Sequence, residues 1–151
     1  MCIRDRATKA RAAGAAARNA LKIAVRNGVL VAFGTDENVY TPGENAGEFA
    51  LMVEWGGMKP MDAIVAATAN AAKLMGWDGE LGTLQGGKMS DVIAVKGDPL
   101  KNIRAMEQVT FVMKGGVVYK ESSLSSAHRP AVRKTGTSSP GILIVRPPDE
   151  R

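Results

Sequence analysis

A carboxylate at the end of an apolar run is the first feature of this sequence whose type and position could do chemistry. Asp36 follows the run Val29–Phe33 after Gly34 and Thr35. An apolar run without polar alternation is typical of a strand buried on both faces, as in a parallel sheet. Proteins of the α/β class carry functional side chains at the C-terminal ends of such strands. Asp36 is therefore a candidate functional carboxylate, although the pattern fits equally well an Asp that only caps a loop.

Helices are expected on both sides of this strand. The Ala-, Arg- and Lys-rich segment before it predicts a helix over residues 15–27, which Gly28 ends through a left-handed C-cap. After the strand, Asn45 and Glu48 have the spacing of a capping box, which predicts that a short helix begins there. The strand is therefore expected to lie between two helices.

A longer helix is predicted from Pro60 to Met75, because Pro60 suits a first helical turn and Gly76 suits a helix end. Side chains at helical spacing predict its buried face. They are Met61, Ile64, Val65, Thr68, Ala71, Ala72 and Met75. Methionines at this spacing are more typical of a core than of a cofactor site.

Beyond this helix the pattern becomes strand-like. The predicted strands are Asp91–Val95, Val109–Met113 and Val117–Tyr119. Lys114-Gly115-Gly116 predicts the hairpin turn between the second and the third of them. We expect these short strands to form a separate sheet or part of a sandwich.

Charge and composition exclude two classes of partner. The net charge of +5 arises mainly at the N-terminal end, where residues 1–26 hold seven Lys or Arg against one Asp. Residues 27–120 hold eight basic against eleven acidic residues, and aromatic residues make up only 5% of the chain. Nucleic-acid binding favours a basic patch with aromatic stacking residues, and a membrane span needs a long apolar stretch. We expect neither a nucleic acid nor a membrane as partner.

The two ends of the chain predict location and order. Met1–Arg6 is too short and too charged for a secretion signal, and the single cysteine, Cys2, permits no intrachain disulfide. Both features suit the cytoplasm. Residues 121–151 are rich in Ser, Pro, Arg, Thr and Gly and are expected to form a mostly disordered tail. The only histidine, His128, lies in this tail and is not expected to bind a metal.

Seven sequence blocks follow one another at informative spacing. They are Gly28–Asp36, Gly43–Phe49, Lys59–Ala63, Ala67–Ala72, Gly82–Val95, Gly97–Leu100 and Val112–Tyr119. Each block is weak alone. In this order, between Lys9 and Lys120, they resemble the C-terminal part of the metal-dependent amidohydrolase superfamily, in the branch that includes imidazolonepropionase-like enzymes and Xaa-Pro dipeptidases.

The resemblance implies an α/β fold. Residues 7–80 would form the C-terminal end of a TIM (β/α)8 barrel, with its last strand and flanking helices, and residues 81–120 would form part of a small β-sandwich. The implied activity is hydrolysis of a C–N bond, in a non-standard amide or an Xaa-Pro dipeptide, by a water activated on one or two divalent metals, usually zinc. The implied partner is thus a small-molecule amide or dipeptide, and a homo-oligomer is left open.

The resemblance gives Asp36 two roles in the parent enzyme. It matches the family's aspartate at the end of the eighth strand, which ligates the metal and acts as the general base. A carboxylate suits this chemistry because it can take a proton from a metal-bound water and pass it to the leaving amine. Thr68, Asn70 and Asp91, which lie in other matching blocks, are expected to be structural.

The remaining ligands of the family site have no counterpart here. The family supplies a His-x-His pair, a modified Lys or a Glu, and two further histidines, whereas this chain has no histidine before His128. A catalytic zinc usually needs three protein ligands. We therefore expect a fragment that is inactive alone and binds no metal, zinc or other, by itself. The alternative is a non-catalytic interaction module that retains the amidohydrolase scaffold.

The loop around Asp36 also departs from the family pattern. A small residue is expected where Glu37 stands, and a histidine is expected near Thr41. Several polar side chains of this loop could line a substrate mouth, although as loop residues they are more often simply solvated. They are Glu37, Asn38, Tyr40 and Asn45.

Overall fold

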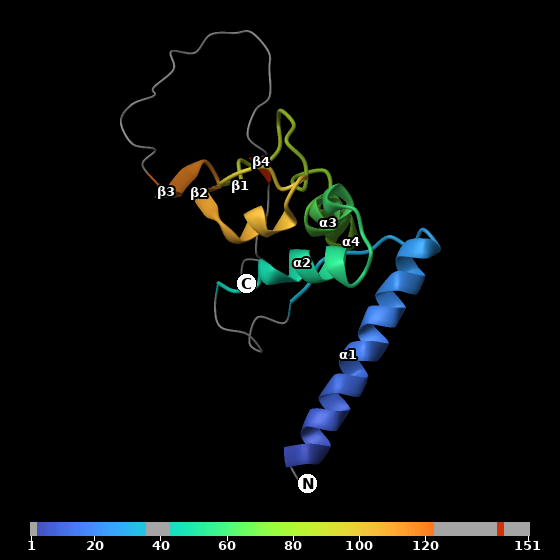
Figure 1. The fold of residues 1–151 in the computed structure, drawn as a ribbon. Helices are drawn as coiled ribbons and strands as arrows, with labels where there is room; N and C mark the ends of the chain where they lie inside the picture. The colour runs from blue at the N-terminus through green and yellow to red at the C-terminus, as the bar shows by residue number, and fades with distance from the viewer. Residues whose placement is uncertain (1–2, 36–42, 123–141, 144–151) are drawn as a thin grey trace.

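The computed structural model describes residues 3–35, 43–122 and 142–143 (Figure 1). An antiparallel sheet lies on one side of the body, and three short helices, α2, α3 and α4, lie beneath it (Figure 1). A long helix, α1, runs away from this body (Figure 1). Within the described ranges, no helix combines the length and hydropathy that crossing a membrane requires.

Helix α1 spans Ile3–Arg26 and is therefore longer than the helix predicted over residues 15–27. Gly14 lies inside this helix, where the roughly 1 kcal/mol cost of one Gly is outweighed by the surrounding strong helix formers. The predicted end is confirmed, since Gly28 has a φ of 67°. Near its C-terminus, Leu21 and Val25 pack against the core.

The segment from Val29 to Thr35, named here the extended segment, runs as an uncoiled trace after α1 (Figure 1), but the predicted strand over Val29–Phe33 is wrong, because no strand of the described chain pairs with it. A strand is defined by hydrogen bonds to a neighbour, and the apolar pattern of the sequence reports burial only. The burial is itself partial, since Val29 and Leu30 are 57% and 66% exposed.

Helix α2 spans Gly47–Glu54. The predicted capping box is wrong, because the N-cap is Ala46 and no side chain caps the helix. The backbone N–H of Glu48 instead donates to the backbone carbonyl of Asn45 over 3.1 Å. The turn before the helix thus uses main-chain groups where the sequence suggested side chains.

The helix predicted from Pro60 to Met75 is broken. Helix α3 spans Pro60–Ala67 and helix α4 spans Ala69–Met75, with Thr68 between them at φ −124° and ψ −89°. Gly76 ends α4 in the left-handed conformation, as predicted. The predicted buried face is wrong for Met61 and Met75, which are 49% and 41% exposed. The prediction is confirmed for Thr68 and Ala72, which are buried. Three small side chains that were not predicted also face the core, and they are Ala63, Ala66 and Ala67.

The sheet has the strand order β3-β2-β1-β4, and all its pairs are antiparallel. Its strands are β1 (Val92–Val95), β2 (Val109–Lys114), β3 (Val117–Glu121) and β4 (Ile142–Leu143). The predicted hairpin is confirmed, since Gly115 and Gly116 have φ values of 55° and 81° between β2 and β3. Strand β4 lies in the segment expected to be disordered, and the other residues beyond 122 lie outside the described ranges.

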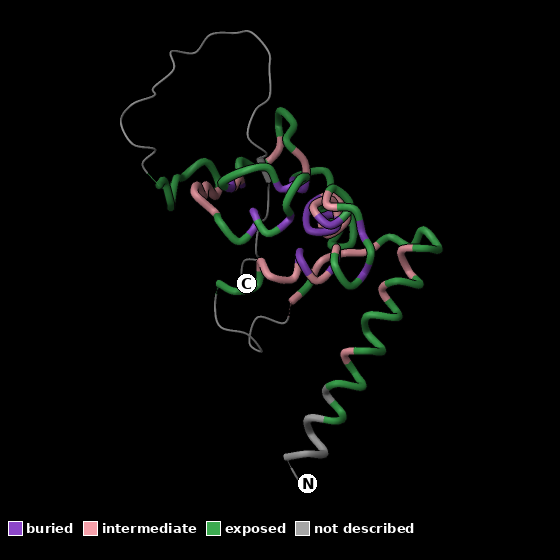
Figure 2. Tube along the Cα trace, viewed as in Figure 1, coloured by how far each residue is buried: buried purple, intermediate pink, exposed green. Residues whose placement is uncertain are grey.

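The core lies between the sheet and the short helices (Figure 2). A 3-10 helix, η2 (Ile103–Glu107), connects β1 to β2 and contributes Met106, which is only 1% exposed. From below, Phe49 and Met52 of α2 enter the same cluster. The extended segment joins it through Phe33, whose ring lies 4.7 Å from that of Phe49, centroid to centroid.

Candidate functional site

Asp36, the predicted site residue, lies outside the described residues, as do Glu37, Asn38 and Tyr40. The site is therefore built up to Thr35, the residue before Asp36 in the sequence. Thr35 lines a hollow of about 260 Å³ at the start of α2. The other residues of this hollow are Glu44, Asn45, Gly47, Glu48, Ala50, Leu51 and Arg104. Asn45 is the one predicted mouth residue that the described chain places here.

Two hydrogen bonds and one ring contact hold the segment that leads to Thr35. The backbone N–H of Phe33 donates to the carbonyl of Ala66 over 3.0 Å, and the side-chain Nδ2 of Asn70 donates to the carbonyl of Val31 over 2.9 Å. The contact between Phe33 and Phe49 adds an apolar anchor on the side of α2. The segment is thus fixed by helices α2, α3 and α4.

Glu48 gives the hollow its main electrostatic feature. It lies in the first turn of α2, and burial raises the pKa of its carboxyl above the ordinary value of 4.5. Desolvation disfavours the charged form, and a raised pKa is the expected result. The second carboxylate of the hollow, Glu44, is exposed. The hollow therefore combines one partly buried and one solvated carboxylate.

Arg104, the basic residue of the hollow, is held by acidic partners. Its guanidinium lies 2.9 Å from Glu54 and 3.3 Å from Glu107. All three side chains are about half exposed, so these pairs are of the weak surface type. Their geometric effect is to connect α2 to η2 beside the hollow.

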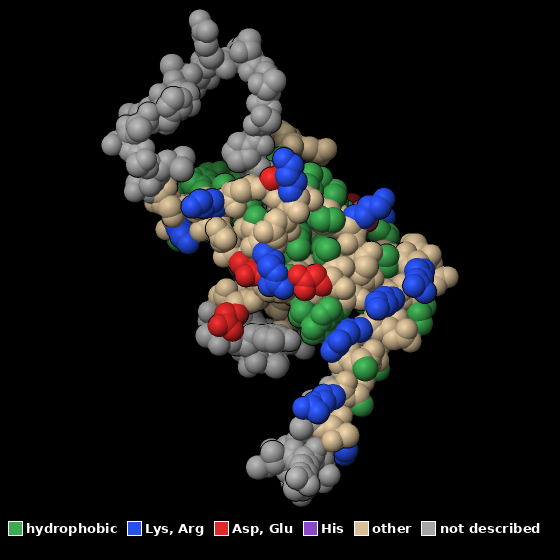
Figure 3. Space-filling view, in the orientation of Figure 1, with side chains coloured by type: hydrophobic (Ala, Val, Ile, Leu, Met, Phe, Trp, Pro, Cys, Tyr) green, Lys and Arg blue, Asp and Glu red, His purple; other side chains and the backbone are tan. Residues whose placement is uncertain are grey.

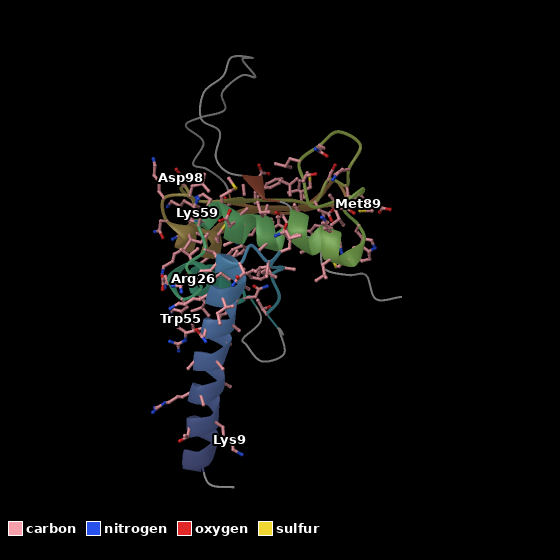
Figure 4. The ribbon with its side chains drawn as sticks, turned by 90° about the vertical axis from the view of Figure 1, so that its right-hand side faces the viewer. Lys9, Arg26, Trp55, Lys59, Met89 and Asp98 are labelled. Atoms are coloured by element: carbon pink, nitrogen blue, oxygen red, sulfur yellow. The ribbon has the colours of Figure 1, made fainter. Side chains whose placement is uncertain are left out.

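Glu48 also borders a second hollow, of about 400 Å³, between α1, α2 and the extended segment. On its α1 side, the guanidinium of Arg18 lies 3.9 Å from the centroid of the Trp55 ring. Trp55 accordingly lies beside α1 (Figure 4). Lys and Arg side chains are spaced along α1, as Figure 3 shows, and the Arg18 contact ties one of them to the body.

A catalytic metal needs more ligands than the hollow provides. In the part of the chain that the structure describes, no group of three or more His, Cys, Asp or Glu side chains is placed to hold a metal ion. The two carboxylates of the hollow, Glu44 and Glu48, fall short of the three protein ligands that a catalytic zinc usually requires. The described donor set therefore does not fit a zinc site.

Three residues predicted to be structural make hydrogen bonds that agree with this role. The hydroxyl of Thr68 donates to the carbonyl of Ile64 over 2.8 Å, and Asn70 holds the extended segment as described above. Asp91 is 1% exposed and accepts from the backbone N–H of Gly115 over 2.6 Å, which fixes the hairpin turn. The sequence did not predict the role of the Ala66 carbonyl, because main-chain carbonyls carry no sequence signal. It did not predict the hollow beside Glu48 either, because the spacing of Glu48 from Asn45 indicated a helix cap.

Comparison with known proteins places this arrangement in a family. The sequence pattern of the "Amidohydrolase family" matches residues 4–119. The curated relative "Ochratoxinase" from Aspergillus niger is 43% identical over 101 residues, which cover 64% of this chain and 21% of the relative. This chain thus spans about a fifth of the length of the curated relatives that it matches.

Solved structures that resemble this chain point to the same family. A structure of a Xaa-Pro dipeptidase with bound methionine in the active site has a TM-score of 0.66 and 43% identity, covering 68% of this chain and 25% of that one. The structure of A. niger ochratoxinase has a TM-score of 0.68 and 34% identity, covering 86% and 31%. With residues 4–119 matching the family pattern and the fold shared with these enzymes, the chain belongs to the amidohydrolase family.

Proposed function

We propose that this chain forms the C-terminal part of a metal-dependent amidohydrolase that hydrolyses a C–N bond in a small amide or an Xaa-Pro dipeptide. The observation that carries the proposal is the family match over residues 4–119. The relatives named Xaa-Pro dipeptidase and ochratoxinase, both 43% identical to this chain where they align, support the substrate class. Under this proposal, residues 29–35 correspond to the last strand of a (β/α)8 barrel, and the sheet corresponds to part of a β-sandwich.

Asp36 is the residue to which we assign chemistry. It follows the segment held by Ala66 and Asn70, and Thr35 before it opens into the hollow beside Glu48. As a carboxylate, Asp36 can accept a proton from water and return it to a leaving amine. Its second proposed role is to occupy one coordination position of a divalent metal, usually zinc in this family. Since the described donor set does not fit zinc, the other ligands must come from outside these residues, and we expect no hydrolysis by the chain alone.

A complementation assay tests this assignment. The purified chain, with and without Zn²⁺, is first assayed on acyl-proline and Xaa-Pro substrates, and we expect no turnover. It is then co-expressed with A. niger ochratoxinase from which the matching segment has been deleted. We expect the co-purified complex to hydrolyse an ochratoxinase substrate, and Asp36→Asn to remove this activity while Asp78→Asn, at an exposed Asp that does not line the hollow, retains it. Turnover by the chain alone, or full activity of a complex carrying Asp36→Asn, would contradict the proposal.

A second candidate function is a non-catalytic interaction module. The observation that favours it is that the described residues contain a core of their own and no cluster of metal ligands. An interaction module should be soluble and monodisperse alone, and it should not bind the truncated ochratoxinase. Size-exclusion chromatography with light scattering, carried out on the chain alone and on the co-expressed mixture, separates the two candidates.

A further inference from the structure

The break between α3 and α4 directs the carbonyls of the last helical turn to new partners. The carbonyl of Ile64 accepts from the Thr68 hydroxyl over 2.8 Å, and the carbonyl of Val65 accepts from the Thr68 N–H over 3.2 Å. In an unbroken helix, the carbonyl of Ala66 would accept from the backbone N–H four residues later. It accepts instead from the N–H of Phe33 over 3.0 Å. Ala66 has no exposed surface, so the residue offering this carbonyl is shielded from water.

A second bond reaches the extended segment from α4. The Nδ2 of Asn70 donates to the carbonyl of Val31 over 2.9 Å. Groups of residues two apart in an extended chain lie on the same side, and both bonds therefore approach one edge of residues 31–33. On residues 31–33 the two bonds involve main-chain atoms only, the carbonyl of Val31 as acceptor and the N–H of Phe33 as donor.

This pair of bonds has the pattern of a parallel strand pairing. In a parallel pair, a residue of one strand lies opposite residue i of its neighbour. Its N–H donates to the carbonyl of residue i−1, and its carbonyl accepts from the N–H of residue i+1. Around Ala32, the side chain of Asn70 supplies the donor and the carbonyl of Ala66 supplies the acceptor. The broken helix thus presents to this segment the two groups that one residue of a strand would present.

Gly82 packs closely against the residues around the break. A Cβ placed there would lie 2.6 Å from the Cβ of Ala72 and 3.0 Å from the carbonyl oxygen of Thr68. Only a glycine allows the loop to pack so closely on the start of α4. The geometry of the break, and with it the direction of the Asn70 side chain, is therefore supported by packing.

We propose that Asn70 is a positioning residue. Together with the Ala66 carbonyl, it takes the place of a neighbouring strand at Val31–Phe33 and so fixes the course of the chain to Thr35, which lines the hollow. The residue that Asn70 would position through Thr35 is Asp36, and the effect of Asn70 on catalysis therefore rests on the proposed function.

Backbone NMR of the ¹⁵N-labelled chain tests the inference. In Asn70→Ala, and in the isosteric non-donor Asn70→Asp, we expect the order parameter of the Thr35 amide to fall from about 0.85 to below about 0.6. We also expect the Phe33 amide to exchange at least about tenfold faster, because its bond opens locally, while the amides of β1 keep their protection.

Three control variants make the test specific. Asn27→Ala removes a similar bond, from the Asn27 side chain to the Ile23 carbonyl over 2.7 Å, and should leave Thr35 ordered. Ile103→Val weakens the core beneath the sheet and should also leave Thr35 ordered. Unchanged Thr35 and Phe33 amides in both Asn70 variants, or an equal loss of order in Ile103→Val, would overturn the inference. Asp36→Asn should not alter these amides, and the failure of the proposed function therefore shows only in the complementation assay.

Discussion

Replacing Gly82 by Ala should separate the contributions of backbone conformation and of packing at the helix break to the free energy of unfolding. Gly82 has a φ of 87°, and its added Cβ would meet the Ala72 Cβ at 2.6 Å, the Thr68 carbonyl oxygen at 3.0 Å and the Ala69 Cα at 3.2 Å. None of these atoms is the far end of a flexible side chain. The substitution therefore forces helix α4 to shift.

The magnitude follows from three terms. An L residue at such a φ costs about 1–2 kcal/mol. Overpacking in a close contact costs about 1–3 kcal/mol. Reduced freedom of the unfolded chain returns about 0.4–1 kcal/mol. We therefore expect Gly82→Ala to lower the free energy of unfolding by about 1–5 kcal/mol, measured by urea denaturation followed by circular dichroism.

Two neighbouring glycines provide matched controls. Gly87 has a φ of 90° but no atom within 4 Å of an added Cβ, so Gly87→Ala should show only the backbone terms, a net loss of free energy of unfolding between about 0 and about 1.6 kcal/mol. Gly86 has neither a positive φ nor a close neighbour, and Gly86→Ala should be neutral or slightly stabilising. Equal losses in Gly82→Ala and Gly87→Ala would refute the packing argument.

Two further predictions concern the charges beside the hollow. Because burial raises the pKa of Glu48 above 4.5, the folded state holds this proton more tightly than the unfolded state, and stability should fall as pH rises from about 4.5 through the raised pKa. Glu48→Gln should lack this loss, so its free energy of unfolding in urea denaturation should rise relative to that of the wild type between pH 4 and pH 7. Glu44→Gln is the control, and a difference that shrinks as pH rises would contradict a raised pKa of Glu48. Arg104→Met should cost less than about 1 kcal/mol, and less still at high salt, because its pairs with Glu54 and Glu107 are about half exposed. A larger or salt-independent loss would mean that Arg104 acts through packing.

The local features of the fold were predictable because they depend on nearby residues. The hairpin at Gly115-Gly116 and the helix end at Gly76 both require a positive φ, which glycine signals directly in the sequence. Hydrophobic periodicity likewise reports α2 and the strands β1, β2 and β3, whereas the strand that it predicted over Val29–Phe33 is not formed. Each of these features is decided within a few residues.

The missed features depend on contacts between distant residues. The break at Thr68 is accompanied by a bond from Phe33 and close packing of Gly82, and neither alters the helical periodicity of residues 60–75. The exposure of Met61 follows from Ala63 and Ala66, whose small side chains face the core instead. At the site, the family pattern led to Asp36, whereas the groups that hold the approach to it are a main-chain carbonyl and an amide side chain that had been assigned a merely structural role.

The two-point contact on residues 31–33 has a consequence for sequence variation. Because Ala66 and Asn70 contact only main-chain atoms of the extended segment, no side chain there is needed for either bond. Exchanges such as Val31→Ile should therefore be tolerated as long as the chain remains extended. Proline at position 33 is the exception, since it lacks the N–H that the Ala66 carbonyl accepts. A library of variants over residues 31–33 should thus accept changes of side-chain shape among apolar residues, which keep Val31 and Phe33 packed on the core. It should select against the loss of a single main-chain hydrogen.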